Sequence, residues 1–410
     1  MLTSTDIQNL RQVARRYAQA AALPVQTEKR TLWRDHNELR SARPMVLIDQ
    51  ICWSEIELGE AYTGTVQDPF WHQVEARLLR TLYCWEHFPV DMVLPPYISV
   101  PKPIHDSGWG ISQQVETLYL ENTDIPSQKM TDILEEESAL SQIRMPEVTL
   151  DTGRMEQIRQ EADRIFEGII PYHMEGSVMH LGIWDTISYW RGVENIYFDL
   201  LDRPEYLHAI METVTNGLLQ RLEQMNRLGC YDVTSTLVHC SHTFLDDLPG
   251  AGADPEFGTT EHGWAFGMAQ LFSSVSPAVT EEFEVEYMKR IFPHFGAVYY
   301  GCCERLDDRL DVIRKLPNIR KISCSPWSDR ERFAEAMPEW CVMSVKPNPA
   351  FLAAASFDEE SVRKELRFAM DAAKRYGRNV EFLLKDISTV RYDPERLVHW
   401  AQIAMEEVQR

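Results

Sequence analysis

The sequence predicts an α/β fold, in the form of a (β/α)8 TIM barrel with N-terminal helices and an elaborated loop after the second strand. Eight apolar, β-rich runs are distributed along the chain, and amphipathic stretches with helical periodicity lie between them. A chain of 410 residues with 44% hydrophobic content can fill the core of such a domain. A doubly wound open sheet is the alternative fold with the same alternation of strands and helices.

The predicted strands are apolar runs that mostly end in polar residues. In chain order they span residues 43–51, 90–100, 167–176, 231–240, 295–303, 319–326, 341–349 and 379–387. In a barrel, the carboxyl ends of all these strands meet on one face, which is the catalytic face of such folds. The residues at these ends are therefore the first candidates for a functional site.

The intervening stretches predict helices with recognisable ends. Residues 204–229 carry apolar side chains every three or four positions, and Gly229 follows as a C-cap. Residues 358–377 form a second helical stretch, in which Asp358 is a plausible N-cap. Residues 155–166 predict a further helix.

The domain organisation follows from what interrupts this pattern. No internal repeat or low-complexity segment is present, so residues 1–410 are expected to form a single domain. Residues 1–42 read as a helical extension packed outside the barrel. Residues 101–166 are too long for a simple crossover, and we expect them to form an insertion over the active-site face.

The charge balance limits the classes of partner. Lys and Arg number 41 and Asp and Glu number 63, and the resulting net charge of -22 disfavours nucleic acid and anionic membranes. The N-terminus lacks the apolar core of a signal peptide, and no later stretch approaches the length of a membrane span. We therefore expect a cytoplasmic protein with reduced thiols that acts on a small molecule. A homodimer is compatible with the sequence.

Polar residues at the strand ends are the candidate site residues. The candidates for catalysis are Asp49, Glu304 and Asp386. The candidates for substrate binding are His173, His239, His242, Trp327, Lys346 and Asn348. For each there is a structural alternative: a satisfied buried pair for His173, a capped turn after His242, a plain turn in "KPNP", and a plug at the rim for Trp327.

Three cysteines are candidate metal ligands. Cys302, Cys303 and Cys324, together with Glu304 and a histidine, would supply the thiolate, carboxylate and imidazole groups that zinc prefers. Because side chains alternate along a strand, only one of Cys302 and Cys303 is expected to face the site unless the chain has already turned into a loop. Their Cα atoms, about 3.8 Å apart, are poorly placed for a disulfide. Buried, chemically inert thiols are the alternative.

Several longer segments resemble the uroporphyrinogen decarboxylase superfamily. They are "FDLLDRPEYLHAIMETVTNGLLQRLEQMNRLGCYDV", "SPAVTEEFEVEYMKRIFPHFGAVYYGCCE", "SVKPNPAFLA" and "FLLKDISTVRYDPERLVHW", within roughly residues 165–405. The resemblance implies a (β/α)8 barrel. True decarboxylases of this superfamily carry an arginine motif, "RQAGR", at the end of the first strand, whereas this chain has "VLIDQICW" there. It is therefore more similar to the corrinoid-linked methyltransferase branch.

In that branch, the resemblance implies a zinc ion held by a His-x-Cys pair on the fifth strand and a cysteine on the eighth, which activates a thiol to accept a methyl group. Cys302 matches the motif cysteine, but Tyr300 stands at the position of the histidine. Near the eighth-strand cysteine, Asp386 is the nearest candidate ligand. A zinc shell would therefore draw on other residues, for example Cys303, Glu304, Cys324, Asp386 and a histidine at 239 or 242.

The sequence leaves three functions open. The first is a zinc-dependent methyltransferase. It would move a methyl group between an acceptor and either a small methylated substrate or a corrinoid, and a corrinoid protein would be its partner. The second is a decarboxylase acting on a small or tetrapyrrole carboxylate, in which Asp49 and Asp386 handle protons and Lys346 or Lys385 holds the carboxylate. The third is a non-catalytic protein that binds cobalamin or another tetrapyrrole.

Overall fold

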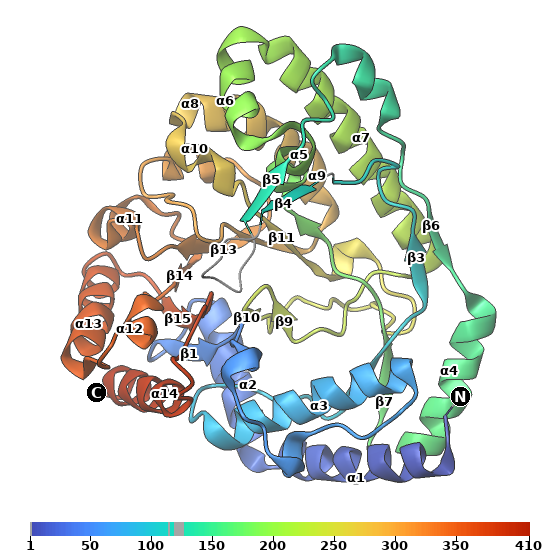
Figure 1. Ribbon diagram of the computed structural model, residues 1–410. Coiled ribbons are helices and arrows are strands. Elements are labelled where there is room, and N and C mark those ends of the chain that lie inside the picture. Colours follow the sequence, from blue (N-terminus) through green and yellow to red (C-terminus); the bar gives the residue numbers. More distant parts are fainter. Residues whose placement is uncertain (1, 114, 119–126) are drawn as a thin grey trace.

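A seven-stranded parallel sheet forms the centre of the computed structural model, which describes residues 2–113, 115–118 and 127–410 (Figure 1). Every neighbouring pair of strands in this sheet is parallel, so the carboxyl ends of all seven lie along one edge. From one edge of the sheet to the other, the strands are β8 (His180–Leu181), β11 (Trp264–Gly267), β12 (Ala297–Tyr300), β13 (Ile319–Cys324), β14 (Val342–Val345), β15 (Val380–Leu384) and β1 (Met45–Ile48).

The sheet is compatible with a barrel, but over the described ranges no strand pairing joins its edge strands β1 and β8. A short hairpin of β9 (Leu237–Val238) and β10 (Ser241–His242) and residues 90–94 contact this region instead. The N–H of Asp91 donates to the carbonyl oxygen of Val46 at 2.9 Å, and the N–H of Val93 donates to Nε2 of His242 at 3.1 Å. These hydrogen bonds attach residues 90–94 to the free edge of β1 and to the hairpin, without a strand ladder.

Five of the eight predicted strands are confirmed in the main sheet, and three are corrected. The runs at 90–100 and 167–176 supply β2 (Ile98–Pro101) and β7 (Tyr172–Glu175), which pair with each other outside the main sheet. The run at 231–240 contributes only the first strand of the hairpin, because "DVTST" lies in a loop. The strands of the main sheet that the sequence did not predict are β8 and β11. With two residues, β8 is too short to stand out as an apolar run, whereas β11 is as long as β1 and lies outside the predicted runs.

The helices lie around the outside of the sheet in Figure 1. The predicted helices are confirmed as α4 (Thr152–Phe166), α7 (Pro204–Leu228) and α13 (Glu359–Arg375). Gly229 ends α7 in the left-handed region, with φ of 61°, and the carboxylate of Asp358 accepts the N–H of Ser361 at the start of α13. None of the described helices combines the length and apolar character needed to cross a bilayer. The other α-helices after α4 are α5 (Ile183–Arg191), α6 (Val193–Asp202), α8 (Pro277–Thr280), α9 (Glu286–Ile291), α10 (Leu310–Ile313), α11 (Arg330–Ala336), α12 (Ala350–Ala353) and α14 (Glu395–Val408).

The two helices within residues 1–42 belong to different cores. The first, α1 (Ser4–Ala21), packs with α3 (Pro69–His87), α4, β2 and β7 around a second apolar cluster, seen at the bottom of Figure 1. The second, α2 (Pro24–Asn37), packs on the main core through the fully buried Trp33, whose Nε1–H donates to the carbonyl oxygen of Asp91 at 2.7 Å. Asn37 donates to the carbonyl oxygens of His242 and Phe244, so α2 also holds the hairpin.

Residues 101–166 contain short antiparallel pairs before α4. They are β3 (Ile104–Asp106) with β6 (Val148–Leu150) and β4 (Val115–Leu118) with β5 (Ser127–Met130); the connection between β4 and β5 lies outside the described residues. Trp109 packs against Trp190 of α5 with ring centroids 6.0 Å apart. The insertion is thus attached to the helices that follow it in the chain.

A buried charge network crosses the interior of the sheet. Nζ of Lys321 on β13 lies 2.9 Å from Oε2 of Glu381 on β15, and both side chains are 0% exposed. Ser241 of the hairpin donates to the same Glu381 oxygen at 2.9 Å, and Nε2 of His36 lies 3.4 Å from it. Because an isolated buried charge is costly, these four side chains tie β13, β15, the hairpin and α2 together.

Replacing Glu381 with Ala is expected to lower the free energy of unfolding by about 3–5 kcal/mol, because the ammonium group of Lys321 would remain buried without its partner. Urea unfolding followed by circular dichroism would measure the change. Glu286→Ala, which breaks an exposed contact with Lys289 on α9, is the matched control and should cost less than about 1 kcal/mol. Equal effects of the two substitutions would contradict this reading of the network.

Candidate functional site

The candidate site lies where β12 and β15 end. After β12 the chain turns at Gly301, with φ of 90°, and Cys302 and Cys303 follow. After β15 come Lys385 and Asp386. These strands are separated in the sheet by β13 and β14, and three strand spacings in a flat sheet would be about 14 Å. Nζ of Lys385 nevertheless lies 3.0 Å from Sγ of Cys302, so the sheet curls and the lysine reaches across its concave side.

Both adjacent cysteines contribute to the site. Their sulfur atoms lie 3.5 Å apart, and Sγ of Cys303 donates to Oδ2 of Asp386 at 2.8 Å. The turn at Gly301 explains why strand alternation does not separate them, because the backbone has left the strand before Cys302 begins. A Cβ at Gly301 would meet Leu306 at 2.6 Å, so the turn requires glycine both for space and for its positive φ.

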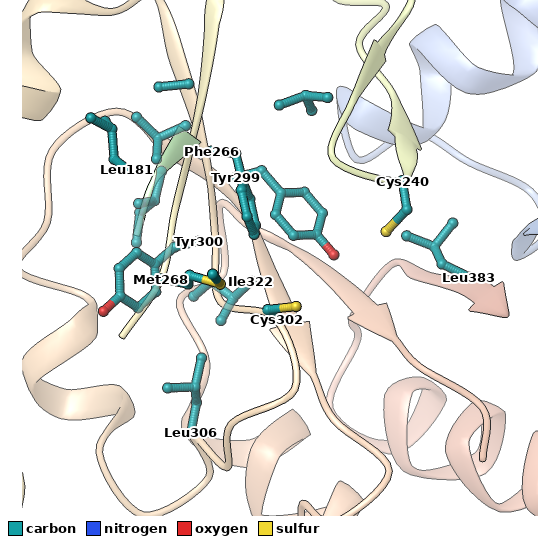
Figure 2. Close-up of a cluster of buried hydrophobic side chains, with 14 of the residues drawn as sticks. Leu181, Cys240, Phe266, Met268, Tyr299, Tyr300, Cys302, Leu306, Ile322 and Leu383 are labelled. Carbon is teal, nitrogen blue, oxygen red and sulfur yellow. The ribbon is translucent and has the colours of Figure 1, made fainter. Parts of the chain in front are cut away.

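The charges around Cys302 favour its thiolate. Its side chain lies at the edge of a cluster of buried apolar residues, near Tyr299, Met268 and Ile322 (Figure 2). The neighbouring Cys303 side chain, with further contributions from His239 and Lys385, holds the pKa of Cys302 well below its usual value despite its burial. The same interaction with Cys302 raises the pKa of Cys303. At neutral pH the pair is therefore one thiolate and one thiol.

Lys385 is the cation of the cluster. Its Nζ lies 3.1 Å from Oδ2 of Asp386, as well as 3.0 Å from the Cys302 sulfur. Burial alone would lower the pKa of Lys385, but the adjacent thiolate outweighs burial and the pKa is raised. The sequence suggested Lys385 only as a carboxylate-binding residue in the decarboxylase alternative; the structure gives it the role of counter-ion to a thiolate.

His239 reaches the cluster from the turn of the β9–β10 hairpin, where its φ is 54°. Its ring stacks on Phe266 of β11 with centroids 3.9 Å apart, and Nε2 lies 3.1 Å from Nζ of Lys385. Burial lowers the pKa of His239 to about 4, so the imidazole is neutral at pH 7. A neutral imidazole can accept a proton or bind a metal ion.

Glu304 supports the backbone of Cys302. Its carboxylate accepts the N–H of Cys302 at 2.8 Å and the N–H of Ala269 at 3.3 Å. Burial raises the pKa of Glu304 to about 7. Tyr300, at the position of the histidine in the superfamily motif, donates its hydroxyl to the buried Glu284 at 3.1 Å and so faces a different group of residues.

A cavity of about 670 Å³, within the size range of small-molecule sites, lies at the end of β1. The cluster residues do not line it, but Asp49, whose pKa responds to Lys385 and Asp386, connects it to them. Asp49 lines it at the end of β1, and burial raises its pKa against the opposing effect of Lys385 and Lys346. The α3 wall, with Arg77 and Arg80, was not predicted from the sequence, because its residues come from a helix and not from a strand end. Trp53 also lines this cavity and was not among the predicted site residues.

Four predicted residues have structural contacts away from the sulfur cluster. Sγ of Cys324 accepts a hydrogen bond from Arg330 at 3.4 Å. Lys346 is buried beneath the site and donates to Ser344 at 3.0 Å and to Tyr299. Asn348 accepts the N–H of Ala350 at 3.0 Å. His242 lines the 670 Å³ cavity, but Nδ1 lies 2.7 Å from the carbonyl oxygen of Thr236 and Nε2 accepts the N–H of Val93.

Two further predicted residues lie elsewhere. The ring of Trp327 is 69% exposed, with no contact to the cluster recorded in the described part of the chain. His173 on β7 packs against Tyr97 with ring centroids 4.6 Å apart, and it lines a different cavity. The residues that the structure does bring together are Cys302, Cys303, Asp386 and His239, with Glu304 behind them and Asp49 in the neighbouring wall.

The chemistry of the cluster fits a zinc ion. The sulfur atoms of Cys302 and Cys303 and a carboxylate oxygen of Asp386 all lie within 4.8 Å of one another. Thiolate and carboxylate are zinc ligands, but the ammonium group of Lys385 lies 3.0 Å from the Cys302 sulfur and 3.1 Å from Oδ2 of Asp386, so it would have to withdraw for zinc to bind them. His239 contacts this ammonium group at 3.1 Å and lies outside the group of three ligand atoms. The set differs from the ligands implied by the resemblance, since the end of β15 supplies a carboxylate.

Comparison with known proteins assigns no family. No protein-family model matches the sequence, and no curated protein matches it significantly. Among solved structures, one described as a methyltransferase from Methanosarcina mazei aligns with 93% of this chain and 98% of its own, at 12% sequence identity and a TM-score of 0.47. At that level of similarity, function has to be argued from the site itself.

The depressed pKa of Cys302 predicts a thiolate that persists in mildly acidic solution. In metal-free protein, the ultraviolet absorbance of this thiolate, taken as the difference between wild type and Cys302→Ser, should persist to pH values well below about 8.5, near which a free thiol titrates. Lys385→Met and Cys303→Ala should each move the titration midpoint upward, because each removes a group that stabilises the anion. Lys289→Met, on the surface of α9, should leave it unchanged. A wild-type midpoint near 8.5 would contradict the assigned charges.

Proposed function

We propose that this chain is a zinc-dependent methyltransferase, with Cys302, Cys303 and Asp386 as protein ligands and His239 as a fourth ligand or as a neighbour of the acceptor. The observation that carries the proposal is the convergence of two sulfur atoms and a carboxylate oxygen within 4.8 Å at the carboxyl ends of parallel strands. When bound there, zinc would lower the pKa of an acceptor thiol, so that a nucleophilic thiolate is present at neutral pH.

The protein groups divide the proton chemistry of this site. Lys385 holds Cys302 as a thiolate, so this sulfur needs to lose no proton when zinc takes the place of the ammonium group beside it. Cys303 must lose its proton before it can bind, and Oδ2 of Asp386 is the atom that its thiol already contacts, at 2.8 Å. Glu304 fixes the backbone N–H of Cys302 and so orients the sulfur.

The neighbouring cavity supplies the substrate site. Asp49 is a candidate proton donor or acceptor on one wall, since its pKa is raised by burial. On the α3 wall, the guanidinium of Arg80 lies 5.3 Å from the ring centroid of Trp53, and no ion pair occupies it within the described segments. A substrate carrying an anionic group at one end and its reacting group at the other would fit between Arg80 and the cluster.

The methyl donor in this proposal is a small methylated molecule or a corrinoid. A cavity of about 670 Å³ suits a drug-sized ligand, so a corrinoid would have to present its methyl group at the open rim on a carrier protein. The same proposal includes two further points. The chain would belong to the uroporphyrinogen decarboxylase superfamily, and its sheet would close as a (β/α)8 barrel. A non-catalytic cobalamin-binding protein would show a spectral change with cobalamin but no turnover.

The decarboxylase alternative receives less support from the contacts. It requires a free lysine to hold the substrate carboxylate, but Lys346 donates to Tyr299 and Ser344, and Lys385 is paired with the Cys302 sulfur and Asp386. Release of carbon dioxide from a carboxylate substrate in the presence of a chelator would favour this alternative. Activity at the wild-type rate in Asp49→Ala would count against it.

Purified protein from zinc-supplemented cells is expected to contain about one zinc ion per chain, measured by inductively coupled plasma mass spectrometry. Cys302→Ser, Cys303→Ser and Asp386→Asn should each reduce zinc affinity by at least about tenfold, because each removes a ligand. Cys324→Ser is the matched control, since Cys324 is buried against Arg330 apart from the cluster, and it should keep its zinc.

Methyl transfer from methylcobalamin to a thiol panel should require zinc and be lost with the same three ligand substitutions. Zinc-free protein that transfers methyl groups at the wild-type rate would overturn the metal mechanism. Zinc binding without methyl transfer to or from any donor or acceptor in the panel would overturn the methyltransferase assignment while leaving the metal site intact.

A further inference from the structure

A second cavity, of about 510 Å³, lies at the opposite end of the sheet. Trp264 opens β11 and Val178 precedes β8, so the cavity adjoins the amino ends of the strands, whereas the sulfur cluster follows the carboxyl ends. Leu237 lines both cavities. The β9–β10 hairpin is therefore the partition between them, and the second cavity does not belong to the proposed methyl-transfer site.

Asp232 places a buried carboxylate in the wall of this cavity. Its side chain is 5% exposed, and Oδ1 accepts the N–H of Thr234 at 2.9 Å and the hydroxyl of Thr234 at 2.7 Å. The charged side chain that perturbs Asp232 most is Glu175, which is itself acidic. Across the described ranges, no basic side chain forms an ion pair with Asp232; the ammonium group of Lys102 is near enough for Asp232 to affect its pKa, but it donates to the carbonyl oxygens of Gly229 and Glu256. A buried carboxylate without a directly paired cation is costly, so a cationic group in the cavity would relieve that cost.

Arg30 of α2 supplies the complementary charge to the same cavity. Its guanidinium lies 5.1 Å from the ring centroid of Phe244, and no carboxylate of the described chain pairs with it. Arg34, one turn along α2, is by contrast neutralised by Asp246 at 3.3 Å. Tyr97 lies near both charges. Burial and, to a smaller extent, the charge of Asp232 raise the pKa of Tyr97 to about 12, and the charge of Arg30 opposes this rise.

We propose that the cavity binds a small zwitterion, of the α-amino acid class, with its ammonium group at Asp232 and its carboxylate at Arg30. The volume of about 510 Å³ lies in the range of small-molecule sites. Apolar side chains, including Leu245 and Leu248, line the rest of the cavity and would receive the ligand's side chain. The mixed lining disfavours a simple amine, which Arg30 would repel, and a simple carboxylate, which Asp232 would repel.

The test is a thermal-unfolding screen of the full chain with the standard amino acids, each at about 10 mM, which detects millimolar affinity. At least one amino acid should raise Tm, and calorimetry should give a dissociation constant for it. The corresponding amine without the carboxylate and the corresponding acid without the amine should each bind at least about tenfold more weakly. No stabilisation by any amino acid would overturn the proposal, and equal binding of the amine or the acid would overturn the zwitterion assignment.

Two substitutions locate the bound ligand. Asp232→Asn and Arg30→Gln should each weaken its affinity by at least about tenfold, because each removes one charge partner. Their controls are Asp247→Asn, on the nearby surface, and Arg15→Gln, on α1, which lie outside the cavity lining and should bind as wild type does. Arg30 is exposed, so Arg30→Gln should fold even if Asp232→Asn does not. Wild-type affinity in Arg30→Gln, or an equal loss in the controls, would overturn the proposed site.

Discussion

The contact between the Lys385 ammonium and the Cys302 sulfur, at 3.0 Å, is the interaction on which the candidate site depends. It joins the ends of β12 and β15 across two intervening strands, which a flat sheet would not allow. The curl of the sheet, the turn at Gly301 and the partition of charge between Cys302 and Cys303 are all required for this contact. Oδ2 of Asp386 and Nε2 of His239 lie 3.1 Å from the same ammonium nitrogen, so Lys385 is the centre of the cluster.

The concave side of the sheet is unusually polar for a buried surface. Lys321 pairs with Glu381 in the interior, Lys346 contacts Tyr299 and Ser344, and Lys385 reaches the thiolate at the carboxyl end. Each ammonium group has a hydrogen-bonded partner, which is the condition for tolerating buried charge. The hairpin that carries His239 into the site is held by the same network through Ser241, so the stability of the interior and the geometry of the site are connected.

The sequence predicted those parts of the structure that depend on local pattern. Five apolar runs became strands of the main sheet, and the caps at Gly229 and Asp358 lie where helical periodicity ends. The strand β8 was missed because it has only two residues, and β11 was missed although it is as long as β1. The run at 231–240 was wrong because the hairpin is positioned by tertiary contacts with α2 and Glu381. Placing candidates at strand ends selected Cys302, Cys303 and Asp386, but no local pattern could reveal that Cys324 faces Arg330 or that Arg80 on α3 lines the cavity.

X-ray absorption at the zinc edge tests the central claim most directly, because it reports the atoms that surround the metal. The proposed ligand set predicts two sulfur neighbours at about 2.3 Å and one or two oxygen or nitrogen neighbours at about 2.0–2.1 Å. In Cys303→Ser the sulfur count should fall to one. A shell of oxygen and nitrogen alone, or a spectrum unchanged by Cys303→Ser, would contradict a zinc site built on the adjacent cysteines.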